Sequence, residues 1–219
     1  DETLGINPQD DSFLQKPIWD LEHTPQEEFP LLLHYHPLHL YRYQVCKQAD
    51  TVLAHYLFPD YQDKETEENS FRYYEKITTH DSSLSTCVFS IMASRLGLKD
   101  KAYYYFGDSA KMDLLNTHKN SKDGIHAANM GGSYMAIVNG FARVQAEEDK
   151  LFLAPALPEN WQGYHFRIRY HGSLLEVSVN KETCSIEQLE GTAITVELYG
   201  KEYVLEAANQ KVEVPYQEN

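Results

Sequence analysis

The sequence predicts a chain that is mainly helical over its first two-thirds and β-stranded over its last third. Two observations carry this prediction. Apolar residues recur at helical spacing between about residues 38 and 141, and after Ala142 the apolar period switches to two. A length of 219 residues, with 42% hydrophobic residues, 16 Tyr and 9 Phe, allows a sizeable core and argues against disorder.

The net charge of −14 argues against partners such as nucleic acid or an anionic membrane surface. The acidic residues are spread along the chain, so any bound anion must be held by local donors. No apolar run is long enough to cross a membrane. Cys46, Cys87 and Cys184 have neither disulfide nor zinc spacing and are expected to be buried free thiols, which points to a reducing, cytoplasmic location.

Residues 1–37 are punctuated by five prolines and are predicted to form an irregular arm of the helical domain, packed on another part of the protein. The chain begins at Asp1 without a Met, so we expect it to be cut from a longer polypeptide.

Five helices are predicted in the domain that spans 38–145. Their ranges are 38–57, 66–76, Asp81 or Ser82 to Leu96 with Gly97 as C-terminal cap, 100–115 with Asp100 as N-cap, and 127–141. The adjacent Gly131 and Gly132 cost roughly 1 kcal/mol each relative to Ala, so another helix or a ligand is expected to approach closely there. Several helices are apolar around much of their circumference, as expected for part of a larger helical layer.

The domain at 150–219 is predicted to be a small antiparallel β unit. Its strands are expected at 150–154, 164–170, 173–180, 192–198, 202–206 and 210–214. Turns between them are expected at Asn180-Lys181, Tyr199-Gly200 and Asn209-Gln210.

The segment Thr79-His-Asp-Ser-Ser-Leu-Ser85 crowds polar side chains at a helix start. Unpaired N–H groups and a partial positive charge at a helix N-terminus suit an anion, and the hydroxyls of Ser82 and Ser83 add donors. A plain capping sequence, with Asp81 or Ser82 as the cap, explains the pattern equally simply.

The segment Asp123-Gly-Ile-His-Ala-Ala128 is similar, because Gly124 permits a tight turn and His126 enters a helix. The imidazole of His126 could donate to an anion, or it could pack against backbone. Lys47 and Gln48 fall within the predicted 38–57 helix. Lys47 could reach a sugar hydroxyl or extend to solvent.

Two other constellations are weaker. His34 and His36 have metal-compatible spacing, but no third ligand lies at a useful distance, so no metal is predicted. A triad of Ser82, His126 and Asp81 can be drawn, but no nucleophile elbow supports it. A Gly-rich phosphate loop of the nucleotide type is also absent from the sequence.

Several motifs in order give the chain a family resemblance. They are Leu32-Leu-His-Tyr-His-Pro-Leu38, Lys47-Gln-Ala-Asp-Thr-Val-Leu53, Tyr56-Leu-Phe-Pro-Asp60 and the two segments at 79–85 and 123–128. Together they closely resemble the C-terminal part of the maltose, trehalose and kojibiose phosphorylases, glycoside hydrolase family 65. The resemblance covers essentially the whole chain and is strongest from about 30 to 145.

The resemblance implies the closing helices of an (α/α)6 barrel, followed by a small antiparallel β-sandwich. It also implies inverting phosphorolysis of an α-glucosidic disaccharide to β-glucose 1-phosphate and a released sugar, by a homodimeric enzyme. Inorganic phosphate is the co-substrate and no cofactor is expected. Phosphate takes the place of the activated water of an inverting hydrolase, so neutral or cationic donors are needed where a hydrolase places its base.

By the resemblance, Ser82, Ser83 and His126 bind phosphate, and Lys47 and Gln48 bind the glucosyl unit. The family's general acid is a Glu in an earlier segment without a counterpart here. The chain is therefore expected to contain no catalytic residue and to be inactive alone. A maltose phosphorylase or a close relative is expected. The alternatives are a hydrolase of the same family acting on trehalose or kojibiose, and a non-catalytic sugar-binding fragment.

Overall fold

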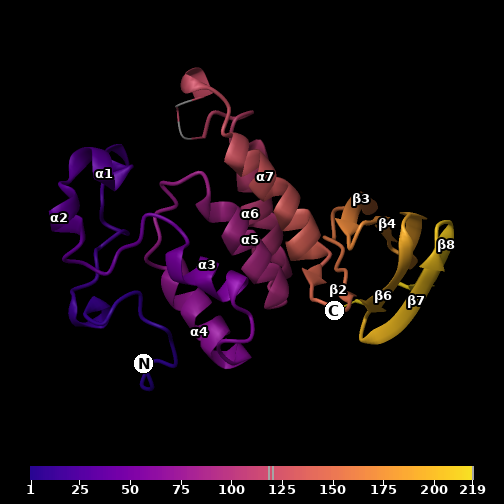
Figure 1. Cartoon of the computed structure of the whole chain (residues 1–219). Coiled ribbons are helices and arrows are strands. Elements are labelled where there is room, and N and C mark those ends of the chain that lie inside the picture. The colour runs from indigo at the N-terminus through magenta and orange to yellow at the C-terminus, as the bar shows by residue number, and fades with distance from the viewer. Residues whose placement is uncertain (118, 120, 219) are drawn as a thin grey trace.

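In a computed structural model, which describes residues 1–117, 119 and 121–218, helices are followed by β-sheets (Figure 1). This order confirms the predicted fold class. The helical elements are η1 (Phe13–Gln15), η2 (Gln26–Glu28), α1 (Leu31–His34), α2 (Pro37–Leu40), α3 (Asp50–Leu57), α4 (Lys64–Glu75), α5 (Ser85–Arg95), α6 (Lys99–Lys111), η3 (Ser121–Asp123), α7 (Ala127–Met135) and η4 (Ala136–Phe141), the last with π-helical geometry.

The N-terminal arm packs against α4. The backbone N–H of Asn7 donates to Oγ of Ser70 at 3.1 Å, and the hydroxyl of Tyr74 donates to the carbonyl of Asn7 at 2.8 Å. Phe13, on η1, is buried in the core of the helical part. The arm is therefore held by the helices, although the predicted boundaries at 37, 145 and 150 stay predictions.

The predicted helix over 38–57 is wrong in its first half, because only α2 and α3 are helical there. The backbone between α2 and α3 is hydrogen-bonded to segments that are distant in the sequence. The N–H of Gln44 donates to the carbonyl of Pro17 at 2.8 Å, and the N–H of Cys46 donates to the carbonyl of Ile77 at 2.8 Å. Backbone groups paired in this way cannot also form i→i−4 helix bonds.

The predicted helix over 66–76 is confirmed as α4. It begins two residues earlier, because the side chain of Asp63 accepts a hydrogen bond from the N–H of Thr66 at 2.8 Å and caps the helix. Phe71 and Tyr74 are its buried anchors, as predicted. Asp100 is not the N-cap of α6, since that helix begins at Lys99 and Leu98 is in the cap position.

Helices α5, α7 and η4 pack closely, and two contacts between them show in which direction they run. Oγ of Ser94 donates to the carbonyl of Gly140 at 3.0 Å, and a Cβ added at Gly132 would lie 2.6 Å from Sγ of Cys87. Later residues of α5 therefore meet later residues of α7 and η4, so these helices run parallel. The N-termini of α5 and α7 consequently lie at the same end of the helical layer.

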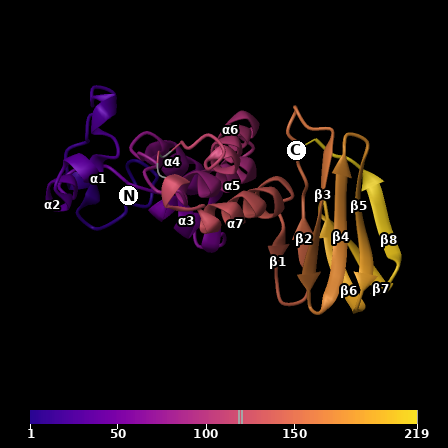
Figure 2. The same cartoon turned by 90° about the horizontal axis from the view of Figure 1, so that it is seen from above.

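The C-terminal domain consists of two four-stranded sheets, in the orders β1-β2-β6-β7 and β3-β4-β5-β8, packed around a shared apolar core (Figure 2). The strands are β1 (Gln145–Ala146), β2 (Leu151–Leu153), β3 (Gly163–Tyr170), β4 (Ser173–Asn180), β5 (Thr183–Glu190), β6 (Thr192–Leu198), β7 (Lys201–Ala207) and β8 (Gln210–Pro215). The prediction omitted β1 and β5. The pairing is antiparallel except between β2 and β6, which are parallel.

Trp161, in the loop between β2 and β3, joins the two parts. Its ring centroid lies 5.3 Å from that of Phe106 on α6 and 5.4 Å from that of Phe141 on η4. Arg143 adds a polar link, because its guanidinium donates to the carbonyl of Ser94 at 2.8 Å. The β domain thus attaches where η4 ends, away from the N-termini of α5 and α7 (Figure 1).

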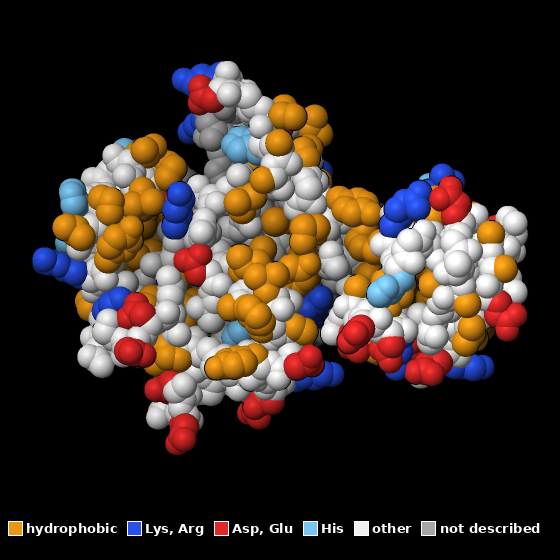
Figure 3. All heavy atoms as spheres, viewed as in Figure 1, with side chains coloured by type: hydrophobic (Ala, Val, Ile, Leu, Met, Phe, Trp, Pro, Cys, Tyr) orange, Lys and Arg blue, Asp and Glu red, His pale blue; other side chains and the backbone are white. Residues whose placement is uncertain are grey.

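Large apolar side chains are exposed over the arm and the helices (Figure 3). The most exposed are Leu33, Leu38, Tyr41, Phe58, Tyr61, Tyr104, Leu114, Leu115 and Ile125. This agrees with the expectation that the helices are part of a larger layer. Within the described residues, no helix has both the length and the apolar character needed to span a membrane.

Candidate functional site

Two loops carrying predicted site residues are joined by backbone hydrogen bonds. Cys46 forms a parallel bridge with Thr78, in which the N–H of Thr79 donates to the carbonyl of Cys46 at 2.9 Å. Lys47 and Gln48 therefore lie beside the start of the 79–85 segment. They belong to a loop that precedes α3, which corrects the predicted mid-helix position.

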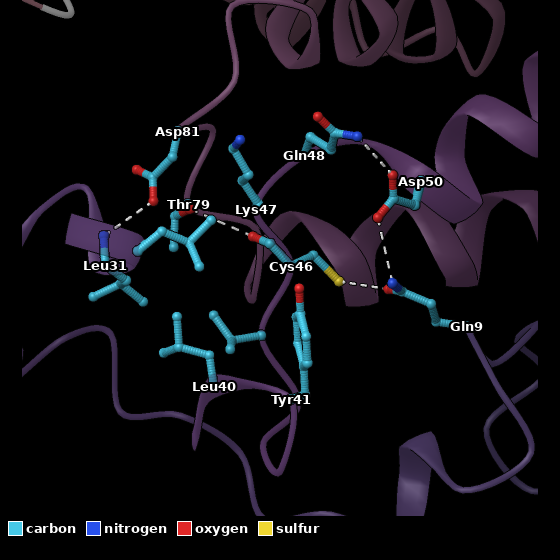
Figure 4. Close-up of a pocket in the computed structure, with 12 residues that line it drawn as sticks. Gln9, Leu31, Leu40, Tyr41, Cys46, Lys47, Gln48, Asp50, Thr79 and Asp81 are labelled. Atoms are coloured by element: carbon cyan, nitrogen blue, oxygen red, sulfur yellow. Dashed lines mark hydrogen bonds between the residues drawn. The ribbon is translucent and has the colours of Figure 1, made fainter. Parts of the chain in front are cut away.

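A cavity of about 230 Å³ opens between these loops and the arm (Figure 4). Lys47 is exposed and lies between Asp81 and Gln48, with Leu40 and Tyr41 across the cavity. The residues that line this first cavity are Gln9, Leu31, Leu32, Leu40, Tyr41, Val45, Cys46, Lys47, Gln48, Asp50, Thr79 and Asp81. Amide, ammonium and carboxylate groups beside apolar side chains form a lining suited to a small polar ligand.

A second cavity, of about 530 Å³, shares a wall with the first. Thr79 and Asp81 line both, and the second is completed by Gln26, Phe29, Pro30, His80, Tyr104, Asp108, Thr117 and Lys119. The carboxylate of Asp81 accepts a hydrogen bond from the N–H of Leu31 at 3.2 Å, which ties the arm to this wall. The two cavities can accommodate two adjoining groups of one ligand, or two ligands that meet at Asp81.

His80 anchors the 79–85 loop. Its backbone has a φ of 56°, which is unusual for a residue other than glycine, and its Nδ1 lies 2.8 Å from Oγ of Ser85. The centroid of its ring lies 4.7 Å from that of Phe89, in an edge-on arrangement, and 5.4 Å from that of Tyr105. Burial lowers the pKa of His80 to about 4, because the apolar surroundings disfavour the imidazolium. His80 is therefore neutral at pH 7 and supports the loop.

Ser82 and Ser83 precede α5, which begins at Ser85, so the predicted helix start at Asp81 or Ser82 is about three residues too early. Leu84 is in the N-cap position without a side-chain cap bond. Oγ of Ser82 accepts from the N–H of Leu84 at a long 3.4 Å. The two serines thus lie in the turn that leads into the N-terminus of an 11-residue helix.

His126 is in the N-cap position of α7 and is bound by Asp113, a residue that sequence reasoning missed. Oδ1 of Asp113 lies 2.6 Å from Nδ1 of His126, and Oδ2 accepts from the backbone N–H of His126 at 2.9 Å. These bonds lower the pKa of Asp113. Asp113 follows the end of α6 and meets the start of α7 because the two helices pack antiparallel, as Ser109, earlier in the chain, donates from its Oγ to Oδ1 of Asn129, later in the chain, at 2.7 Å.

The parallel packing of α5 and α7 places Ser82, Ser83 and His126 at one end of the helical layer. These three residues are not among the described residues that line the two cavities. The carboxylate of Asp81 is hydrogen-bonded to Leu31, and the imidazole of His126 to Asp113. Neither bond joins two members of the triad of Ser82, His126 and Asp81 that was considered from the sequence.

The structure also places the histidines of the metal hypothesis. Nδ1 of His36 accepts from the N–H of Leu38 at 3.2 Å and caps α2. Within the described part of the chain, no group of three or more His, Cys, Asp or Glu side chains is arranged to hold a metal ion.

The fold and site can be compared with known proteins. The protein-family model for the glycosyl hydrolase family 65 central catalytic domain matches residues 1–135 of the chain, and the one for the family 65 C-terminal domain matches residues 144–205. Both models describe glycosyl hydrolases, and this is the class of protein to which the chain is assigned. The chain belongs to glycoside hydrolase family 65, as its motifs predicted.

Several of the proteins to which the chain is similar are phosphorylases. The chain is 60% identical to the α,α-trehalose phosphorylase of Geobacillus stearothermophilus and 34% identical to the maltose phosphorylase of Bacillus subtilis, covering 94% of this chain and 27% of each relative. A solved structure described as "Putative kojibiose phosphorylase from human microbiome" has a TM-score of 0.89 at 30% identity, over 100% of this chain and 32% of that one. The chain thus spans about a quarter of the length of these curated relatives.

Proposed function

We propose that this chain supplies the phosphate-binding and glucosyl-binding parts of an inverting disaccharide phosphorylase. The reaction converts an α-glucosidic disaccharide and inorganic phosphate to β-glucose 1-phosphate and a free sugar, without a cofactor. The main support is the backbone bridge between Cys46 and Thr78, because it brings Lys47 and Gln48 beside the 79–85 segment. The names of the relatives support the same reaction.

In this proposal, the site residues divide between two ligands. Lys47 and Gln48 hold the glucosyl unit at the first cavity. The hydroxyls of Ser82 and Ser83, the N-terminus of α5 and the imidazole of His126 hold phosphate, which attacks the anomeric carbon. Such local donors are needed because the net charge of −14 disfavours an anion at long range. The general acid is expected in an earlier segment of the enzyme.

The preferred disaccharide is proposed to be α,α-trehalose and not the maltose expected from the motifs. Two trehalose phosphorylases share 60% and 44% of aligned residues with this chain, whereas the maltose phosphorylase shares 34%. Phosphorolysis rates of the complete enzyme on trehalose, maltose and kojibiose will distinguish these substrates. A higher kcat/KM for maltose than for trehalose would contradict the proposed preference.

Removing a phosphate ligand should weaken phosphate binding in the complete enzyme. Ser83→Ala and His126→Ala are each expected to raise the phosphate KM by about 10- to 100-fold, because a hydrogen bond to a charged group contributes about 1.5–3 kcal/mol. Initial rates at varied phosphate measure this effect. Ser178→Ala and His165→Ala, both in the β domain, are the matched controls. Unchanged phosphate kinetics in both site variants would refute the assignment.

The chain alone is expected to be inactive, since the proposed general acid lies outside it. The assay mixes the 219-residue chain with trehalose or maltose and phosphate, and measures glucose 1-phosphate. The complete enzyme is the positive control. Turnover by the isolated chain at the rate of the complete enzyme would show that it contains the acid.

Hydrolysis is the second candidate function, because carboxylates line the second cavity. A hydrolase of this family needs a carboxylate to activate water, and among the described residues Asp81 and Asp108 supply carboxylates to that cavity. Product analysis separates the two reactions. Phosphorolysis gives glucose 1-phosphate in proportion to the added phosphate, whereas hydrolysis gives only free sugars at any phosphate concentration.

We also propose a cytoplasmic homodimer. The three cysteines are free and buried, which supports a reducing compartment. The dimer is an expectation from the family resemblance alone, and light scattering on the complete enzyme will test it.

A further inference from the structure

The carboxylate of Asp113 makes two bonds to one residue. Oδ2 accepts from the backbone N–H of His126 at 2.9 Å, and Oδ1 lies 2.6 Å from its Nδ1. The side chains are only 18% exposed for His126 and 14% for Asp113, so solvent competes weakly for these bonds. Asp113 therefore fixes both the backbone at the start of α7 and the orientation of the His126 ring.

The short contact to Nδ1 also determines the form of the ring. The hydrogen bonds from His126 lower the pKa of Asp113, so its carboxylate is ionised near neutral pH. An ionised carboxylate has only acceptor atoms, so Nδ1 of His126 must carry the hydrogen. In this tautomer, Nε2 is the nitrogen through which His126 would interact with phosphate.

We propose that Asp113 is a positioning residue for phosphate, acting through His126. This inference rests on the proposed function, in which His126 is a phosphate ligand. Asp113 keeps its negative charge behind the ring, on the Nδ1 side. A carboxylate that orients a histidine from behind is a recurrent way to fix a tautomer in binding sites.

A purely structural role is the competing explanation, in which Asp113 only caps α7. Asp113→Asn separates the two roles. An asparagine keeps the size and retains a carbonyl oxygen for the N–H of His126, so the cap survives. Its amide group lacks a negative charge and can donate to Nδ1, which favours the opposite tautomer.

In the complete enzyme, Asp113→Asn is expected to raise the phosphate KM by about tenfold or more. The disaccharide KM and the melting temperature are expected to stay close to those of the wild type, and Asp113→Glu to restore part of the phosphate affinity. Asp100→Asn, in the first turn of α6, is the matched control. Wild-type phosphate kinetics in Asp113→Asn, or a rise that matches a fall in melting temperature, would overturn the proposal.

A double-variant comparison tests whether Asp113 acts through His126. Asp113→Asn should add little to the phosphate KM in a His126→Ala background, because the ring that it orients is gone. Equal effects in both backgrounds would overturn the inference. If His126→Ala alone leaves the phosphate KM unchanged, the phosphate role of His126 fails first, and this outcome is distinguishable from failure of the Asp113 proposal.

Discussion

Replacing Phe89 by alanine is expected to lower the free energy of unfolding by about 3–5 kcal/mol, the range for deletion of a buried aromatic side chain. Phe89 has no exposed surface, and its ring lies 5.3 Å from that of Phe71 and 4.7 Å from that of His80. The deletion leaves a cavity in the helical core and removes a wall from the side chain that anchors the 79–85 loop. Stability and loop order should therefore fall together.

Calorimetry of the complete enzyme measures the fall in melting temperature, and hydrogen exchange of peptides covering 79–96 measures the loosened loop. The matched control is Tyr104→Ala, because Tyr104 is also aromatic but is 69% exposed on the neighbouring helix α6. That variant should change stability by no more than about 0.5 kcal/mol. Equal melting temperatures for Phe89→Ala and the wild type would contradict the packing described for α5.

Gly132→Ala should destabilise the helical layer by about 1–3 kcal/mol, the usual cost of overpacking a core. The added methyl carbon would lie 2.6 Å from Sγ and 2.9 Å from Cβ of Cys87, so α5 and α7 must separate. Because both helices begin at the proposed phosphate site, the phosphate KM is expected to rise as well. Thermal unfolding and phosphate kinetics of the complete enzyme measure the two effects.

The neighbouring glycine is the control for this prediction. A Cβ added at Gly131 meets no atom within 4 Å, and alanine favours helix over glycine by about 1 kcal/mol. Gly131→Ala should therefore stabilise the protein slightly, so that the two adjacent substitutions have opposite signs. Equal melting temperatures for the two variants would contradict the close approach of Cys87 to Gly132.

The sequence predicted correctly those helices and strands whose pattern depends only on their own residues. The α4 helix follows from its charged and apolar faces, and the strand at 173–180 from the alternation of apolar and polar residues between Leu175 and Asn180. The β5 strand was missed because it buries polar side chains. Gln188 is fully buried, and its amide donates to the carbonyl of Thr192 at 2.6 Å. A buried glutamine breaks the alternation, and the hydrogen bond from its amide nitrogen to Thr192 is visible only in the folded protein.

Long-range pairing also explains the failed helix over 41–49. Its apolar spacing is compatible with a helix, but bonds to Pro17 and Ile77 hold the backbone extended. The same limit applies to the site. The sequence identified both motif segments, whereas Asp113 lies 13 residues before His126 and meets it only because α6 and α7 pack antiparallel. A motif can be read directly from the sequence, whereas the partner that His126 meets in the fold cannot.

The backbone bridge between Cys46 and Thr78 has a consequence for protein engineering. Two backbone hydrogen bonds join the loop that carries Lys47 to the loop that leads to Ser82, so neither loop can be redesigned independently of the other. Libraries that vary the loop at 44–48 to accept another sugar should therefore include the loop at 77–81. Variants selected on the sugar alone are expected to carry compensating changes in the opposite loop.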